Sequence, residues 1–189
     1  MKRFAVWVMA CAGVLFLAGG VFEQEFSADI VTNSKEGSSR GKVFVAKDKI
    51  RMEMQSAITI ARVDQKKAYM LMPQQKMYME MPSDATNLAT ALEKVPGEIS
   101  RKLIATETID GRQVEKYEVA YDYQGKAETI NIWLSKELHF PLKSAALDNS
   151  WSVEYTNVIE GPQKQELFEL PSGYTKFDYG ATATESAGN

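Results

Sequence analysis

Methionines at alternate positions are the residues whose type and spacing are most distinctive in this sequence. Seven of the nine methionines fall in three short runs, and within each run they are two residues apart. Side chains two residues apart in a β-strand share one face, so each run would place its thioethers on one side of a sheet. The seven are Met52, Met54, Met70, Met72, Met77, Met79 and Met81.

Thioether side chains in this pattern are compatible with three interpretations. Methionine is flexible and polarisable, so a surface rich in it suits a flexible apolar ligand. Thioethers are also soft ligands that favour Cu(I), and runs such as Met77-x-Met79-x-Met81 are similar to the clusters of exported copper proteins. The third interpretation is that the methionines simply fill the core of an all-β domain. The residues alone leave these alternatives open.

Side chains for other chemistry are few. The only histidine is His139, beside Phe140-Pro141, and the only cysteine is Cys11. The sequence contains no Gly-x-Ser-x-Gly motif and no glycine-rich phosphate loop. We therefore expect no enzymatic activity, no cofactor and no metal site built from histidine and cysteine. The net charge of −3 argues against a nucleic-acid partner, which requires a basic surface.

Residues 1–20 have the layout of a secretory signal peptide. Lys2 and Arg3 precede an apolar run from Phe4 to Ala18, and small residues follow the run. The run is short for a membrane anchor. Lipidation of Cys11 is a further alternative. A protein cleaved after these residues would contain no cysteine, and we expect a periplasmic protein that folds without disulfides.

Short strands separated by turns account for most of the remaining sequence. Ten or eleven alternating or β-branched runs follow one another from Phe26 to Val158, and turn residues such as Asp110-Gly111 stand between them. This pattern is typical of an antiparallel barrel or sandwich. We expect a single domain over residues 21–179, and a disordered tail over residues 180–189, which are small and polar.

One short helix is predicted between the sixth and seventh strands. Leu88, Ala91, Leu92 and Val95 have the spacing of one apolar helical stripe, and Pro96-Gly97 ends it. Such a helix could pack against the edge of the sheet or lie as a lid over its concave face.

Four motifs, in their order and spacing, are similar to those of a known family. They are Gly41-Lys-Val-Phe-Val with Ile50-Arg-Met-Glu, Asp64 to Pro73, Ile132-Trp-Leu-Ser with Pro141-Leu-Lys, and Leu167 to Tyr174. Together they resemble the LolA/LolB superfamily of periplasmic lipoprotein carriers over residues 26–177. The resemblance implies an unclosed antiparallel β half-barrel, with helices over its mouth, that holds acyl chains in a hydrophobic hollow.

Two features depart from the family pattern. The carriers begin with a helix, whereas here Phe26 starts a strand soon after the signal peptide. The carriers also tie the lid to the barrel through an arginine after the second strand. Lys47 occupies that place here, and lysine lacks the planar fork of arginine.

The sequence therefore predicts a mainly β, unclosed half-barrel of ten or eleven strands with a short helical lid. We expect a monomeric periplasmic carrier of lipid, or of the acyl chains of a lipidated protein, with an inner- or outer-membrane protein as partner in outer-membrane biogenesis. A Cu(I)-binding protein and an envelope protein-interaction module without ligand are the alternatives. The predicted lining residues are Met52, Met54, Ile58, Ile60, Met70, Met72, Met77, Met79, Met81, Leu88 and Leu92, with Lys47 as the lid contact and Tyr69, Leu71 and Tyr78 on the opposite face.

Overall fold

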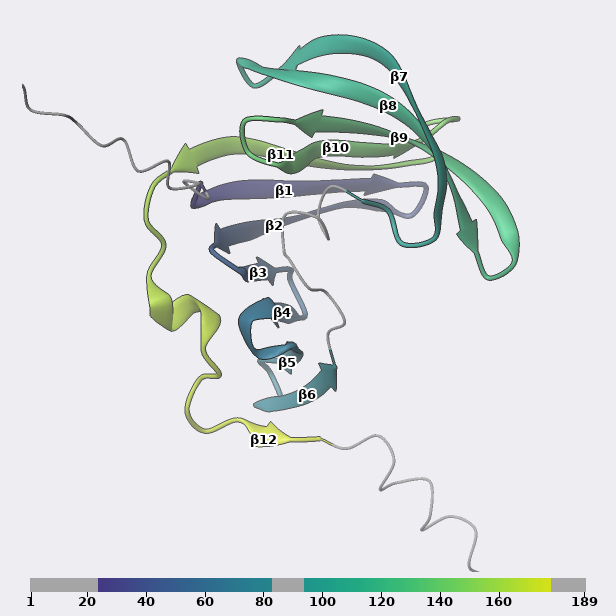
Figure 1. Cartoon of the computed structure of the whole chain (residues 1–189). Helices are drawn as coiled ribbons and strands as arrows, with labels where there is room; N and C mark the ends of the chain where they lie inside the picture. The colour runs from purple at the N-terminus through teal and green to yellow at the C-terminus, as the bar shows by residue number, and fades with distance from the viewer. Residues whose placement is uncertain (1–23, 83–93, 178–189) are drawn as a thin grey trace, which may run out of the picture.

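The computed structural model describes residues 24–82 and 94–177, and twelve β-strands make up most of them (Figure 1). Two short 3-10 helices, η1 (Val63–Gln65) and η2 (Gln165–Phe168), also occur in this part of the chain. The strands are β1 (Phe26–Ser34), β2 (Gly37–Ala46), β3 (Lys49–Glu53), β4 (Ile58–Arg62), β5 (Lys67–Met72), β6 (Met77–Pro82), β7 (Glu98–Ile109), β8 (Arg112–Tyr123), β9 (Lys126–Ser135), β10 (Phe140–Ala146), β11 (Trp151–Glu160) and β12 (Thr175–Lys176).

All twelve strands belong to one unclosed sheet, in the order β12-β6-β5-β4-β3-β2-β1-β11-β10-β9-β8-β7. Neighbouring strands are antiparallel, except that β12 runs parallel to β6. The predicted mainly β, open antiparallel sheet is therefore confirmed. The strand beyond the predicted number is β12, which has only two residues and is too short for a periodic pattern.

The turns follow from residues that tolerate a left-handed backbone. Asp110-Gly111 joins β7 to β8 and Gln124-Gly125 joins β8 to β9, and all four residues have positive φ. Two-residue hairpins favour this conformation because its twist matches that of the flanking strands. These turns produce the long β7–β8–β9 meander that forms one end of the sheet.

The largest core cluster lies where β1 to β3 meet β10 and β11. Phe26, Val43 and Leu142 are fully buried in it. Phe140 stacks edge-on against both Phe26 and Tyr155, with ring centroids 5.1 and 4.7 Å away. This cluster joins the two halves of the sheet.

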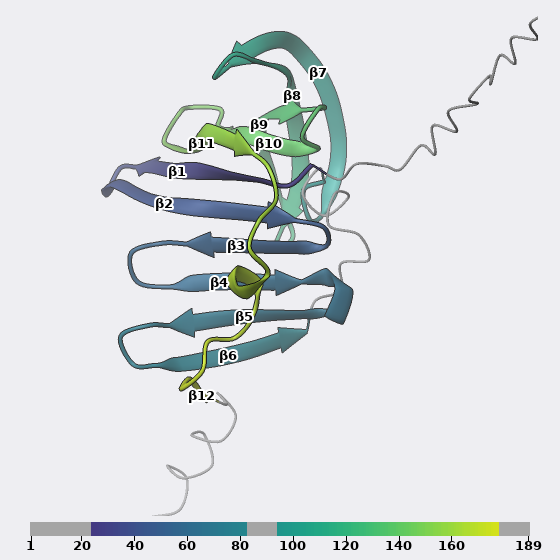
Figure 2. The ribbon, with the colours of Figure 1, turned by 90° about the vertical axis from the view of Figure 1, so that its left-hand side faces the viewer.

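A segment that we call the C-terminal strap, residues 161–177, leaves β11 and crosses one face of the sheet. Its helix η2 contacts β3 and β4, and its end forms β12 against β6. Figure 2 shows the strap in front of β3 to β6, with β7 and β8 behind the sheet. In Figure 1 the strap lies on the left and the ends of β7 and β8 descend on the right. The sheet therefore curls away from the strap, and we call the face that carries the strap the outer face.

Several predictions concern residues that the structure does not describe. The signal peptide at residues 1–20, including Cys11, and the tail at residues 180–189 lie outside the described residues. The same holds for the predicted helix as far as residue 93, and so for the lining residues Leu88 and Leu92.

Candidate ligand-binding site

The strand register places the methionines of β3, β5 and β6 on the same side of the sheet. Met70 lies directly opposite Met79, and Met72 lies directly opposite Met77. Thr59 of β4 pairs with Met52 on one side and with Met70 on the other, and paired residues share a face, so Met52 lies on the same face as Met70. Met81 pairs with Ala68, two residues before Met70, and Met54 packs with Met52 against the largest core cluster. We call this surface the methionine face; its residues are Met52, Met54, Met70, Met72, Met77, Met79 and Met81.

The two faces of the same strands differ sharply in burial. Every residue of the methionine face is half-buried. On the outer face, Ile60 and Leu71 are 0% exposed. Met70, Met72, Met77, Met79 and Met81 belong to none of the three core clusters found among the described residues. The strands therefore seal one face with protein and present a partly open, apolar surface on the other.

The C-terminal strap seals the outer face through Phe168. This side chain is 0% exposed and packs in a cluster with Ile60, Tyr69 and Leu71. Leu167, Leu170 and Tyr174 of the strap pack around the same cluster.

The placement of β4 corrects part of the predicted lining. Met52 pairs with Thr59, so Ile58 and Ile60 point to the outer face and lie across the sheet from the methionines. Strand β4 offers the smaller Thr59 and Ala61 to the methionine face instead. The physical reason is that side chains alternate between the two faces along a strand. Ile58 and Ile60 therefore share a face, and the strand register makes it the outer face, which the strap covers.

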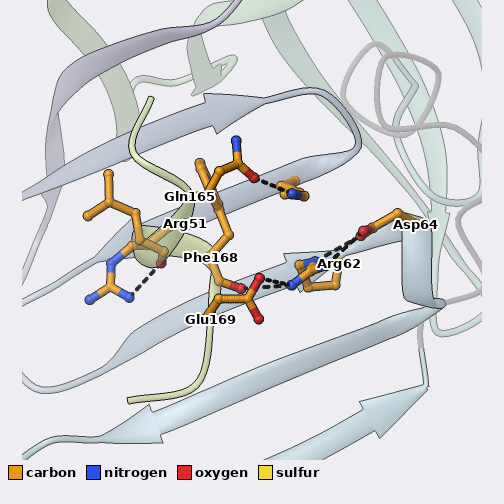
Figure 3. A network of polar contacts seen from close by, with 8 residues as sticks. Arg51, Arg62, Asp64, Gln165, Phe168 and Glu169 are labelled. Atoms are coloured by element: carbon orange, nitrogen blue, oxygen red, sulfur yellow. Dashed lines mark hydrogen bonds and ion pairs between the residues drawn. The ribbon is translucent and has the colours of Figure 1, made fainter. Parts of the chain in front are cut away.

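Two buried arginines, whose role the sequence did not predict, fasten the strap to the sheet (Figure 3). Arg51 is 8% exposed and Arg62 is 6% exposed. Arg51 donates from Nη1 to the carbonyl oxygen of Leu167 at 2.9 Å, and from Nε to Glu53 at 2.6 Å. Both arginines lie on the outer face beside apolar residues, where a buried cation needs nearby acceptors.

Arg62 makes the more extensive contacts with the strap. It donates from Nη1 to the Phe168 carbonyl oxygen at 3.3 Å and to Glu169 at 2.7 Å. Its Nε and Nη2 form a fork around Asp64 at 2.9 and 2.8 Å. Hydrogen bonding from Arg62 lowers the pKa of Asp64 below its ordinary value. The fork keeps the guanidinium oriented toward the strap.

Lys47, the predicted lid contact, lies exposed in the turn between β2 and β3. The lid that it was expected to meet is outside the described residues. The arginines that do join a covering segment to the sheet are Arg51 and Arg62, and the segment they hold is the strap on the outer face.

A groove of about 650 Å³ adjoins the methionine face at Met54. Ile30 and Gly41 contribute to its lining, together with the charged residues Arg40 and Glu53. A Cβ at Gly41 would stand 2.2 Å from the Glu53 carbonyl oxygen and 2.5 Å from Met54 Sδ, so only glycine fits there. Arg40 and Glu53 have the strand parity of the outer face, so the charged part of the groove lies across the sheet from the methionines.

A family model describes most of the region that carries these features. Residues 25–139 match the family described as a domain of unknown function, DUF4412. The chain belongs to this family. The match covers β1 to β9, and so the whole methionine face of the DUF4412 domain. No curated protein matches the sequence.

Solved structures show what the DUF4412 fold is similar to. MucB of Pseudomonas aeruginosa, in its complex with MucA, has a TM-score of 0.53 at 10% identity, over 79% of this chain and 56% of that chain. The chain thus spans little more than half the length of MucB, and at this identity the likeness concerns the fold alone.

A LolA superfamily protein of Nitrosomonas europaea also matches, with 9% identity, a TM-score of 0.36, and coverage of 78% of this chain and 90% of that chain. The unclosed sheet that the resemblance implied is present, and neighbouring strands among β1 to β11 are antiparallel. Among the described residues, no helix is long and apolar enough to cross a membrane.

Proposed function

We propose that this protein is an exported carrier that binds a lipid, or the acyl chains of a lipidated protein, on the methionine face. Export to the periplasm would follow from the signal peptide at residues 1–20. The observation that carries the proposal is the contrast between the two faces of β3 to β6. The outer face is closed by Phe168 and the strap, whereas the methionine face offers half-buried apolar side chains.

The chemistry of the face suits an acyl chain. Burying a CH₂ group contributes about 0.8 kcal/mol, so a chain that covers several methionines gains affinity from many small contacts. Flexible thioethers can adapt to a chain without a fixed shape.

A fluorescent palmitate analogue tests the proposal in a titration of the purified protein. We expect the double variant Met70→Gln, Met79→Gln to bind the analogue roughly tenfold more weakly, or worse. Each glutamine would place an amide against the chain, and burying an unpaired amide costs about 0.5–2 kcal/mol. The two positions face each other directly, so both amides would meet the same ligand.

The matched control removes apolar side chains elsewhere on the surface. Ile99 and Ile159 are 63% and 67% exposed, on β7 and β11. The variant Ile99→Gln, Ile159→Gln should bind the analogue as the unmodified protein does. Equal weakening in both variants would show that binding is non-specific, and no binding by the unmodified protein would favour the protein-interaction module instead.

A further inference from the structure

Four methionines on the hairpin of β5 and β6 form a compact group of soft ligands. Met70 faces Met79 and Met72 faces Met77 across the two strands. Directly paired residues have Cβ atoms about 4.5–5.5 Å apart. Residues two apart along a strand are separated by about 6.8 Å. Methionine has three rotatable bonds, so its sulfur can move by several ångströms and the four thioethers can converge on one point.

We propose that Met70, Met72, Met77 and Met79 bind a soft monovalent metal ion of the Cu(I) or Ag(I) class. Thioethers are soft, neutral ligands and select soft ions over Zn²⁺ or Mg²⁺. The pairing of β5 with β6 matters because it brings the methionines of two separate sequence runs, 70–72 and 77–79, next to each other.

The surroundings of this quartet favour a single positive charge. The nearest ionic groups on the same strands, Lys67 and Glu80, lie on the outer face and pair with each other at 2.9 Å. Neutral thioethers therefore offer no carboxylate to offset a second charge, and a divalent ion would be poorly compensated in a half-buried site. Among the described residues, no group of three or more His, Cys, Asp or Glu side chains could hold a metal ion.

Neighbouring side chains leave room for the ion. Across β4, the partner of Met70 is the small Thr59, and Ala68 lies beside Met70 on the same face. The four methionines are half-buried, so an ion could reach the sulfurs from solvent.

The site lies on the surface proposed for acyl chains, but the two functions depend on different properties of the same residues. Leucine keeps the volume and apolarity of methionine and removes its sulfur. Exchanges that conserve volume and apolarity are the best tolerated in packed proteins, so the variant should fold. The variant Met70→Leu, Met72→Leu, Met77→Leu, Met79→Leu should therefore lose the metal.

Silver is the best first probe because Ag(I) is stable in air. We would titrate the purified protein with silver nitrate in chloride-free buffer by calorimetry and count bound ions by native mass spectrometry. The unmodified protein should bind one Ag(I) in the quartet, and the four-leucine variant should bind it at least tenfold more weakly. The control variant Met52→Leu, Met54→Leu, Met81→Leu removes three thioethers of the same face and should bind as the unmodified protein does.

Three results would overturn the metal site: no Ag(I) binding by the unmodified protein, equal binding by the four-leucine variant, or Zn²⁺ binding as tight as Ag(I) binding. Circular dichroism of each variant checks that the sheet is intact. The palmitate analogue, titrated into the unmodified protein without silver, separates this result from the proposed function. In the unmodified protein, palmitate binding without Ag(I) binding leaves the carrier standing, and Ag(I) binding without palmitate binding leaves the metal site standing.

Discussion

Replacing Phe168 by alanine should reveal how much the C-terminal strap contributes to the sheet. The side chain is 0% exposed and shares its cluster with Ile60 and Leu71, which are equally buried. Truncating a fully buried phenylalanine costs about 3–5 kcal/mol, from lost transfer free energy and the cavity left behind. The carbonyl group of Phe168 that Arg62 contacts is retained in the variant. The whole loss therefore measures the packing of the ring.

Urea denaturation followed by tryptophan fluorescence measures this loss as global unfolding, because Trp133 and Trp151 lie in β9 and β11, several strands away from the β4 and β5 residues that Phe168 contacts. We expect the free energy of unfolding to fall by about 3–5 kcal/mol at these probes. Glu166→Ala, an exposed neighbour in η2, should change it by less than about 0.5 kcal/mol. A loss below about 1 kcal/mol for Phe168→Ala would refute the reasoning, since the strap would then be an appendage that the sheet does not need.

Three further predictions concern the arginine contacts and a close approach of strands. Arg62→Ala should lower the free energy of unfolding by about 1–3 kcal/mol, because it leaves the Phe168 carbonyl group without this donor. In the same denaturation assay, Arg62→Lys should be only partly more stable than Arg62→Ala, because lysine lacks the planar fork of arginine. Arg62 lowers the pKa of Asp64 from its ordinary 3.8, so the contact between them stabilises the fold above about pH 4, and this contribution is lost as the pH falls toward the folded-state pKa. The free energy of unfolding, measured from pH 5 downward, should therefore fall less steeply in Asp64→Asn than in the unmodified protein. Gly41→Ala should cost at least about 1–3 kcal/mol, because its Cβ would meet the Glu53 carbonyl oxygen at 2.2 Å; an unchanged thermal midpoint would contradict this.

The sequence predicts the fold well where alternation is unambiguous. In β5 and β6 one parity carries methionine and the other carries residues such as Tyr69, Leu71 and Tyr78, so each methionine run can be assigned to one face. Turn residues such as Asp110-Gly111 mark the hairpins for the same local reason. These features depend only on neighbours in the chain.

Strand β4 shows where such reasoning stops. Ile58, Ile60 and Ala61 are apolar on both parities, so the pattern does not say which side faces the ligand. The pairing of Thr59 with Met52 decides it, and that pairing belongs to the assembled sheet.

The contacts that hold the strap were missed for a related reason. Arg51 and Leu167, which share a hydrogen bond, are separated by 116 residues, and a single sequence carries no direct sign of that contact. A partial sign existed in arginines placed among apolar strand residues, as in Ile50-Arg51-Met52 and Ile60-Ala61-Arg62. A cation in such a position needs a buried partner, and here the partner is backbone from the far end of the chain.

Native mass spectrometry of the protein, isolated from producing cells without detergent, tests the carrier proposal most directly. We expect an added mass that matches a lipid or an acylated peptide and that organic extraction removes. The variant Met70→Gln, Met79→Gln should carry less of that mass. Protein that carries no apolar ligand, and takes up none when incubated with phospholipid vesicles, would contradict the central claim that the methionine face is a binding surface.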